Sequence, residues 1–205
     1  MKLLKKCLAT CLFCLLALPA AAQNILIVGD SISAAFGLEI EQGWVTLLQE
    51  RISDEGYPHR VVNASVSGDT TAGGHARLPQ LLEKHEPELV VIELGGNDGL
   101  RGLKPTEMQQ NLAAMVDRSR EAGADVVLLG MRIPPNYGVR YTQAFEQVFA
   151  DINTDKDVPL MPFFLVDVAE VADLMQSDRI HPTAQAQPIL LENAWPLIKD
   201  WLDQQ

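Results

Sequence analysis

The chain has 205 residues, of which 47% are hydrophobic and 21% charged, and its formal net charge is −11. So much apolar material in a chain of this length can bury one substantial core, which excludes an intrinsically disordered protein and favours a single domain. The acidic excess leaves no basic surface to neutralise phosphates, and this argues against nucleic acid as a partner.

The first 22 residues differ from the rest and have the parts of a secretory signal peptide. Lysines at positions 2, 5 and 6 precede an apolar run from Cys7 to Leu18, and Ala20 and Ala22 fit a small-residue cleavage site. The run is shorter than the ~20 residues that a membrane-spanning helix needs. We therefore predict a signal peptide at 1–22, a mature domain at 23–205 and a secreted, periplasmic protein; an uncleaved anchor is the alternative.

Cysteine occurs only inside this predicted leader, at Cys7, Cys11 and Cys14. The mature chain should therefore contain no disulfide, and cysteine nucleophiles and cysteine-ligated zinc are excluded. Loss of the three leader lysines takes the formal net charge from −11 to −14.

Apolar runs alternate with helical patterns along the mature chain. The first predicted strand, at 24–28, is followed by Gly29, and the first helix, at 44–52, places Trp44, Leu48 and Ile52 on one face. The alternation then continues with a strand at 60–64, a helix at 71–85, a strand at 88–94, a helix at 105–123, a strand at 125–130, a helix at 141–152, a short strand at 158–161 and a closing helix at 182–202.

This alternation predicts an α/β fold with three layers, in which a central parallel sheet of about five strands carries helices on both faces. No repeat, low-complexity tract or linker suggests a second domain. Ligands of such folds bind at the carboxyl edge of the sheet, so the loop after each strand is where chemistry is expected.

Each of the first three predicted strands is followed by a polar turn. The turns contain Ser31 in Gly29-Asp30-Ser31, Gly68 in Ser67-Gly68-Asp69, and Asn97 in Gly95-Gly96-Asn97-Asp98. Taken singly, each could be an ordinary turn or helix start, and the neighbouring aspartates at 30, 69 and 98 are expected to hold these turns through hydrogen bonds.

A fourth signal lies near the carboxyl end, in Asp178-Arg179-Ile180-His181-Pro182. A spacing of three lets the Asp178 carboxylate accept a hydrogen bond from the His181 imidazole, which fixes the tautomer and leaves the other ring nitrogen as a general base. A surface Asp–His pair without function is the alternative for this fragment alone.

The four blocks together, in this order, resemble the GDSL/SGNH hydrolases, which are defined by blocks carrying Ser, Gly, Asn and His. The resemblance covers nearly the whole mature chain and is greatest to the small periplasmic thioesterase I/lysophospholipase/arylesterase group, which shares the Gly-Gly-Asn-Asp-Gly-Leu-Arg-Gly stretch at 95–102. Arg179 departs from that group, which often has glycine between Asp and Ile, and an effect on access or loop stiffness is expected.

The resemblance implies a flavodoxin-like SGNH fold and a catalytic triad in which Ser31 is the nucleophile, His181 the general base and then acid, and Asp178 the residue that orients the imidazole. It further implies an oxyanion hole formed by the Ser31 and Gly68 backbone N–H groups and the Asn97 side-chain amide. By the same analogy, an acyl groove is expected from apolar loop residues, which could otherwise be loop anchors: Leu100, Leu103, Ile133, Pro134 and Tyr137.

The expected function is hydrolysis of acyl esters and thioesters through an acyl-enzyme, with a small-molecule substrate and no cofactor. The three histidines at 59, 75 and 85 lack carboxylate partners at metal spacing, so no metal is expected. Two alternatives stay open: a carbohydrate acetylesterase built on the same blocks, and a non-catalytic flavodoxin-like binding module. The apolar loops argue against the first, and the missing phosphate-loop glycines and lysine argue against the second.

Overall fold

The computed structural model describes residues 23–205 and contains one five-stranded sheet in which every neighbouring pair of strands is parallel. The spatial order is β2-β1-β3-β4-β5, with β3 in the centre and β1 and β4 on either side of it. The strands are β1 (Asn24–Gly29), β2 (Arg60–Asn63), β3 (Leu89–Glu93), β4 (Asp125–Leu129) and β5 (Leu160–Met161).

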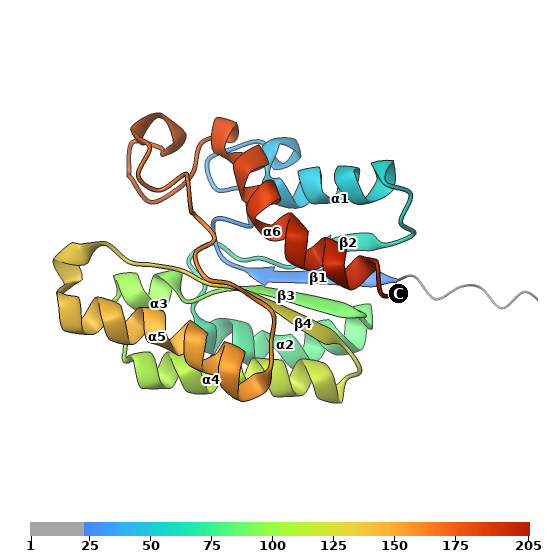
Figure 1. Ribbon diagram of the computed structural model, residues 1–205, viewed down its shortest axis with the longest axis horizontal. Coiled ribbons are helices and arrows are strands. Elements are labelled where there is room, and N and C mark those ends of the chain that lie inside the picture. The colour runs from blue at the N-terminus through green and yellow to red at the C-terminus, as the bar shows by residue number, and fades with distance from the viewer. Residues whose placement is uncertain (1–22) are drawn as a thin grey trace, which may run out of the picture.

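Helices cover both faces of the sheet, as Figure 1 shows. One face is covered by α1 (Trp44–Asp54) and α6 (Gln187–Leu202), which pack against each other. The other is covered by α2 (Thr71–His85), α4 (Pro105–Glu121) and α5 (Val139–Lys156). The remaining short helix, α3 (Gly96–Leu100), lies beyond the carboxyl end of β3. The three-layer parallel α/β fold predicted from the alternating pattern is therefore confirmed.

The sheet's centre forms the core of the protein. All five residues of β3 are buried, and in β1 only Asn24 is partly exposed, because strands covered on both faces have no solvent side. β2 lies at the edge of the sheet. Its two valines are partly buried, and the polar residues at its two ends are exposed. Burial of the central strands fixes the register that brings their carboxyl ends together at one edge.

The structure differs from the sequence-based expectation in a few elements. β5 has only two residues, and the closing helix starts at Gln187, after a short 3₁₀ turn at Ala184–Ala186. The stretch after β3, expected as a turn, contains α3, which begins after Gly95 in the left-handed region with φ 115°. A glycine there allows the chain to turn sharply out of the buried strand into a helix.

The segment between β5 and α6 has almost no regular structure. Besides the 3₁₀ turn at Ala184–Ala186, its regular structure consists of a 3₁₀ turn at Ala172–Leu174 and an isolated antiparallel bridge that pairs Met175 with Pro182. This segment lies over the carboxyl edge of the sheet (Figure 1). Within residues 23–205, no helix has both the length and the apolar character needed to cross a membrane. The predicted signal peptide lies outside the described residues.

Two isoleucines test this placement of the core. Ile92, in β3, is fully buried, and Ile92→Ala should lower the free energy of unfolding by about 2 to 5 kcal/mol because it leaves a cavity between sheet and helices. Ile40 is 71% exposed, so the same change there should stay within about 0.5 kcal/mol. Urea denaturation followed by circular dichroism measures both, and equal losses would contradict the assignment.

Candidate active site

Ser31 lies in the tight turn that follows β1. The backbone N–H of Phe36 donates to the Ser31 carbonyl at 3.0 Å, and that of Ala34 donates to the Asp30 carbonyl at the same distance. Gly29 is required at the start of this turn, because a Cβ there would lie 2.7 Å from Ser33 Cβ and 2.8 Å from Glu93 Oε2. The close approach of β1 to β3 thus fixes where the serine is presented.

Ser31, His181 and Asp178 are joined by a continuous set of hydrogen bonds. Ser31 Oγ lies 2.9 Å from His181 Nε2, and His181 Nδ1 lies 2.7 Å from Asp178 Oδ2. The other carboxylate oxygen, Asp178 Oδ1, accepts the backbone N–H groups of Ile180 at 2.9 Å and His181 at 3.0 Å. The hydrogen bond from His181, followed by that from Ile180, lowers the pKa of Asp178 to about 2, so the carboxylate stays charged beside the imidazole.

Gln176 fastens the loop that carries His181 to the loop that carries Ser31. Its side-chain amide donates to the Phe36 carbonyl at 2.8 Å and to the Pro182 carbonyl at 3.0 Å, and its backbone N–H donates to the His181 carbonyl at 2.8 Å. The Phe36 ring also packs against the imidazole, with ring centroids 4.4 Å apart. These contacts fix the position of the loop that carries His181 relative to the loop that carries Ser31, although the two are far apart in the sequence.

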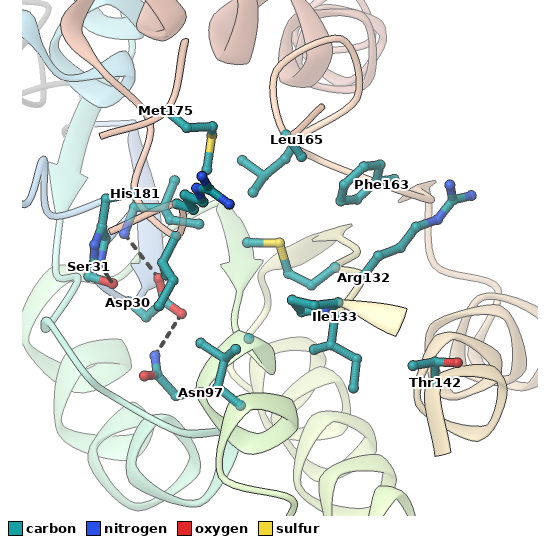
Figure 2. Close-up of a pocket in the computed structure, with 18 of the residues that line it drawn as sticks. Asp30, Ser31, Asn97, Arg132, Ile133, Thr142, Phe163, Leu165, Met175 and His181 are labelled. Carbon is teal, nitrogen blue, oxygen red and sulfur yellow. Dashed lines mark hydrogen bonds between the residues drawn. The ribbon is translucent and has the colours of Figure 1, made fainter. Parts of the chain in front are cut away.

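Of the three predicted oxyanion-hole donors, Ser31 and Asn97 border the same pocket, and Gly68 lies in the turn after β2. Among residues 23–205, the backbone N–H groups of Ser31 and Gly68 donate to no protein acceptor, and Gly68 adopts φ 78° in its turn. Asn97, on α3, uses one amide hydrogen to reach Asp30 Oδ2 at 2.9 Å and retains a second. Figure 2 shows the Asn97 amide aimed at the Asp30 carboxylate beside Ser31.

Arg101 holds the turn that contains Gly68. Its guanidinium Nη2 donates to the Gly68 carbonyl at 2.7 Å. On the other side of the same loop, Asp69 accepts a hydrogen bond from Arg77 Nε at 2.8 Å, and Asp98 accepts from both the backbone and the hydroxyl of Thr71. Asp69 and Asp98 thus fix turns and helix starts through hydrogen bonds, as the sequence predicted.

A buried carboxyl lies directly behind the nucleophile turn. Glu93, fully buried at the end of β3, accepts hydrogen bonds at Oε2 from Ser33 Oγ at 2.6 Å and from the Asp30 backbone N–H at 3.3 Å. Trp44 Nε1 donates in turn to Ser33 Oγ at 3.2 Å. Burial, reinforced by the neighbouring Asp30 carboxyl, raises the pKa of Glu93 well above its usual value.

Sequence reasoning missed Glu93, because it read the strand as apolar throughout. A glutamate inside a run of Leu, Val and Ile is itself a signal, since buried glutamates are rare unless they are paired or hydrogen-bonded. Here it connects β3 to the turn after β1.

Asp30 has its carboxylate in the same buried region. Burial raises the pKa of Asp30 to about 6, opposed by hydrogen bonds from the Ile32 backbone and the Asn97 side chain. The folded protein therefore retains the Asp30 proton at pH values where the unfolded chain, with its ordinary pKa near 3.8, has released it. The stability contributed by this group is full below the unfolded pKa and is lost as the pH rises through the folded value.

Asp30→Asn removes this titration. The free energy of unfolding of the wild type minus that of the variant should fall by about 2 kcal/mol between about pH 4 and pH 7. Denaturant titrations of both proteins at a series of pH values provide the measurement. A difference that is constant over this range would contradict the raised pKa of Asp30.

A pocket of about 560 Å³ opens beside Ser31, Asn97 and His181. Its wall is mainly apolar and combines residues that follow β3, β4 and β5, as Figure 2 shows, including Leu100, Met131, Ile133, Phe163, Leu165 and Met175. Of the residues expected to line a groove, Leu100, Ile133 and Pro134 lie on this wall.

Leu103 and Tyr137 are not on the pocket wall. The Tyr137 hydroxyl donates to the Leu100 carbonyl at 2.9 Å, and the Leu103 carbonyl accepts from the Tyr141 hydroxyl at 2.6 Å. In the structure these two residues anchor the loops around the pocket. The residues Phe163, Leu165 and Met175 take their place, and they come from the irregular segment for which the sequence predicted no element.

A serine hydrogen-bonded to an oriented imidazole, with a free backbone N–H beside a cavity, defines a serine hydrolase type of site. Among residues 23–205, no three His, Cys, Asp or Glu side chains are grouped so that they could hold a metal ion. The model of the GDSL-like Lipase/Acylhydrolase family matches residues 27–188. The chain belongs to this family.

Proteins similar to this chain include esterases and a thioesterase. It is 58% identical over 200 residues to Esterase TesA of Pseudomonas aeruginosa, covering 98% of both chains. It is 42% identical over 186 residues to Thioesterase 1/protease 1/lysophospholipase L1 of Escherichia coli strain K12, covering 91% of this chain and 84% of that protein. The solved structure of the psychrotrophic esterase EstA from Pseudoalteromonas sp., inhibited by monoethylphosphonate, superposes with a TM-score of 0.84 at 47% identity, covering 88% of this chain and 99% of the other.

Proposed function

We propose that this protein is a serine esterase that hydrolyses carboxylic esters and thioesters through an acyl-enzyme on Ser31. The observation that carries the proposal is the hydrogen-bonded series from Ser31 through His181 to Asp178 at the mouth of an apolar pocket. The names of the relatives, which include an esterase, an arylesterase and a thioesterase, support the same reaction class.

In the first half-reaction, His181 Nε2 accepts the Ser31 hydroxyl proton while Ser31 Oγ attacks the carbonyl carbon of the substrate. The negative charge that develops on the carbonyl oxygen is stabilised by the N–H groups of Ser31 and Gly68 and by the Asn97 amide. The C–O or C–S bond then breaks, and His181 gives its proton to the departing alcohol or thiol.

In the second half-reaction, water replaces the leaving group. His181 accepts a proton from the water as its oxygen attacks the acyl carbon, and the proton returns to Ser31 Oγ when the carboxylic acid departs. Throughout, the charged Asp178 carboxylate keeps Nδ1 protonated and therefore keeps Nε2 available to accept a proton.

The pocket favours acyl chains over short acetyl groups. A volume of about 560 Å³ is within the range of small-molecule sites and exceeds what an acetyl group fills. This disfavours the carbohydrate acetylesterase alternative, and the activated serine disfavours a purely binding module.

We also propose that the protein is exported to the periplasm. The support is the charge, apolar and small-residue pattern of the first 22 residues.

Ser31→Ala and His181→Ala should each lower kcat for p-nitrophenyl octanoate by at least about 10⁴-fold, and the double variant should lose little more, because the two residues act as a unit. Asp178→Asn should remain folded and lose about 10³- to 10⁴-fold, because an amide favours the wrong imidazole tautomer. Ser53→Ala, an exposed serine on α1, is the matched control and should keep wild-type activity. A Ser31→Ala variant with full activity, or one still labelled by an organophosphonate, would refute the mechanism.

Acyl-chain preference tests the pocket separately. From acetyl to octanoyl esters, kcat/KM should rise by about fourfold for each methylene that is buried, which corresponds to ~0.8 kcal/mol. Thr142 lies at the end of the pocket away from Ser31 (Figure 2), so Thr142→Trp should reduce the octanoyl preference by shortening the cavity. Leu103→Trp, outside the wall, should leave the preference unchanged. Equal rates for acetyl and octanoyl esters would remove the basis for an acyl pocket.

A further inference from the structure

Arg179 brings a positive charge to the wall of the pocket. It lies between Asp178 and His181 in the loop that ends at Pro182, and it is exposed. Arg179, Ile180 and His181 are consecutive residues, and all three line the pocket.

The backbone at this position favours glycine. Arg179 has φ 58°, in the left-handed region where a Cβ atom is unfavourable. Two of the other four non-glycine residues with positive φ, Glu86 and Asp157, end helices, where this conformation is common. Arg179, like Ala35 and Asp167, ends no helix, so an arginine is held here in a conformation that a glycine would adopt more easily.

The other charged groups on the wall are largely accounted for. Arg132 pairs with Glu146, with Nε and Oε2 3.5 Å apart, and Asp30 accepts a hydrogen bond from the Asn97 amide at 2.9 Å. Within residues 23–205, the Arg179 guanidinium forms no ion pair and no side-chain hydrogen bond. Glu170, also on the wall, lies in the preceding segment, eleven positions from His181. Arg179 is therefore the cation that remains available beside the imidazole.

The chemistry determines which part of the substrate meets this cation. His181 Nε2 must reach both Ser31 Oγ and the atom of the leaving group, since it passes the proton from one to the other. The leaving group consequently departs along the loop that carries His181, while the apolar wall around Ile133 and Phe163 receives the acyl chain. Arg179 thus faces the leaving group's side.

We propose that Arg179 is a specificity-determining residue that binds a phosphate group on the alcohol or thiol part of the substrate. The inference rests on the proposed esterase function and refines its substrate class. A guanidinium pairs with phosphate through two parallel hydrogen bonds, which an exposed lysine or glutamine does not reproduce. The formal net charge of −11 repels anionic substrates at long range, so a local cation is what allows them to bind.

Two pairs of substrates isolate the phosphate. The first pair is octanoyl-4′-phosphopantetheine and octanoyl-pantetheine, which share the thioester and differ only in the phosphate. The second is 1-octanoylglycerol 3-phosphate and 1-octanoylglycerol, which share the carboxylic ester. For each pair, the ratio of kcat/KM for the phosphorylated member to that for the neutral member is measured for the wild type, Arg179→Gln, Arg179→Lys and Arg132→Gln.

In Arg179→Gln the ratio should fall by about five- to tenfold in at least one pair, chiefly through KM, as expected for a partly exposed charge-assisted contact. Arg179→Lys should recover part of the loss. Arg132→Gln removes an equal charge from the part of the wall away from His181 (Figure 2) and should leave the ratio at the wild-type value. The loss in Arg179→Gln should shrink as salt is added.

The pair that responds identifies the source of the phosphate, a phosphorylated thiol or a glycerophosphate. Ratios unchanged by Arg179→Gln in both pairs, or lowered equally by Arg132→Gln, would overturn the inference. Neither result affects the proposed function, which in this experiment would fail if the wild type hydrolysed none of the four substrates.

Discussion

The hydrogen bond between Ser31 and His181 joins the turn after the first strand to the loop before the last helix, 150 residues later. It forms only because β1 lies near the middle of the sheet and the segment after β5 returns over the carboxyl edge. Gln176 then ties the two loops together through the Phe36 carbonyl. The geometry of the nucleophile therefore depends on the topology of the whole domain and on one side-chain amide.

A second constraint acts from inside the core. Glu93 accepts hydrogen bonds from Ser33 and from the Asp30 backbone. The turn that carries Ser31 is therefore held by a core residue on β3 as well as by the loop that carries His181. A buried carboxyl costs desolvation energy, and an apolar residue of similar size would fill the space without that cost. An apolar residue would not supply the hydrogen-bond acceptor that fixes the position of the Ser31 turn relative to β3. We therefore interpret Glu93 as a residue that lowers the stability of the fold but positions Ser31.

The sheet, its helices and the close approach of Ser31, Asn97, Asp178 and His181 could be predicted because they follow from local signals: apolar periodicity, and polar residues at strand ends. The pocket wall could not be predicted as well. Leu103 and Tyr137 are apolar loop residues like Leu100 and Ile133, and nothing in the sequence distinguishes those that face the cavity from those that anchor it. Phe163, Leu165 and Met175 were missed because their segment has no periodicity.

This division has a physical origin. The groups that carry out the reaction lie at or near strand ends or are tied to them by hydrogen bonds, and regular elements position such groups within narrow limits. The apolar residues of the pocket wall lie largely on irregular segments, whose backbone can change without disturbing the sheet. Arg179 lies on the pocket wall but within the loop that carries Asp178 and His181. It adopts a left-handed backbone conformation there, and the hydrogen bonds from the Ile180 backbone and the His181 imidazole to Asp178 are formed. Under the proposed role of Arg179, a change of side chain there alters which esters bind while the reaction that follows stays the same.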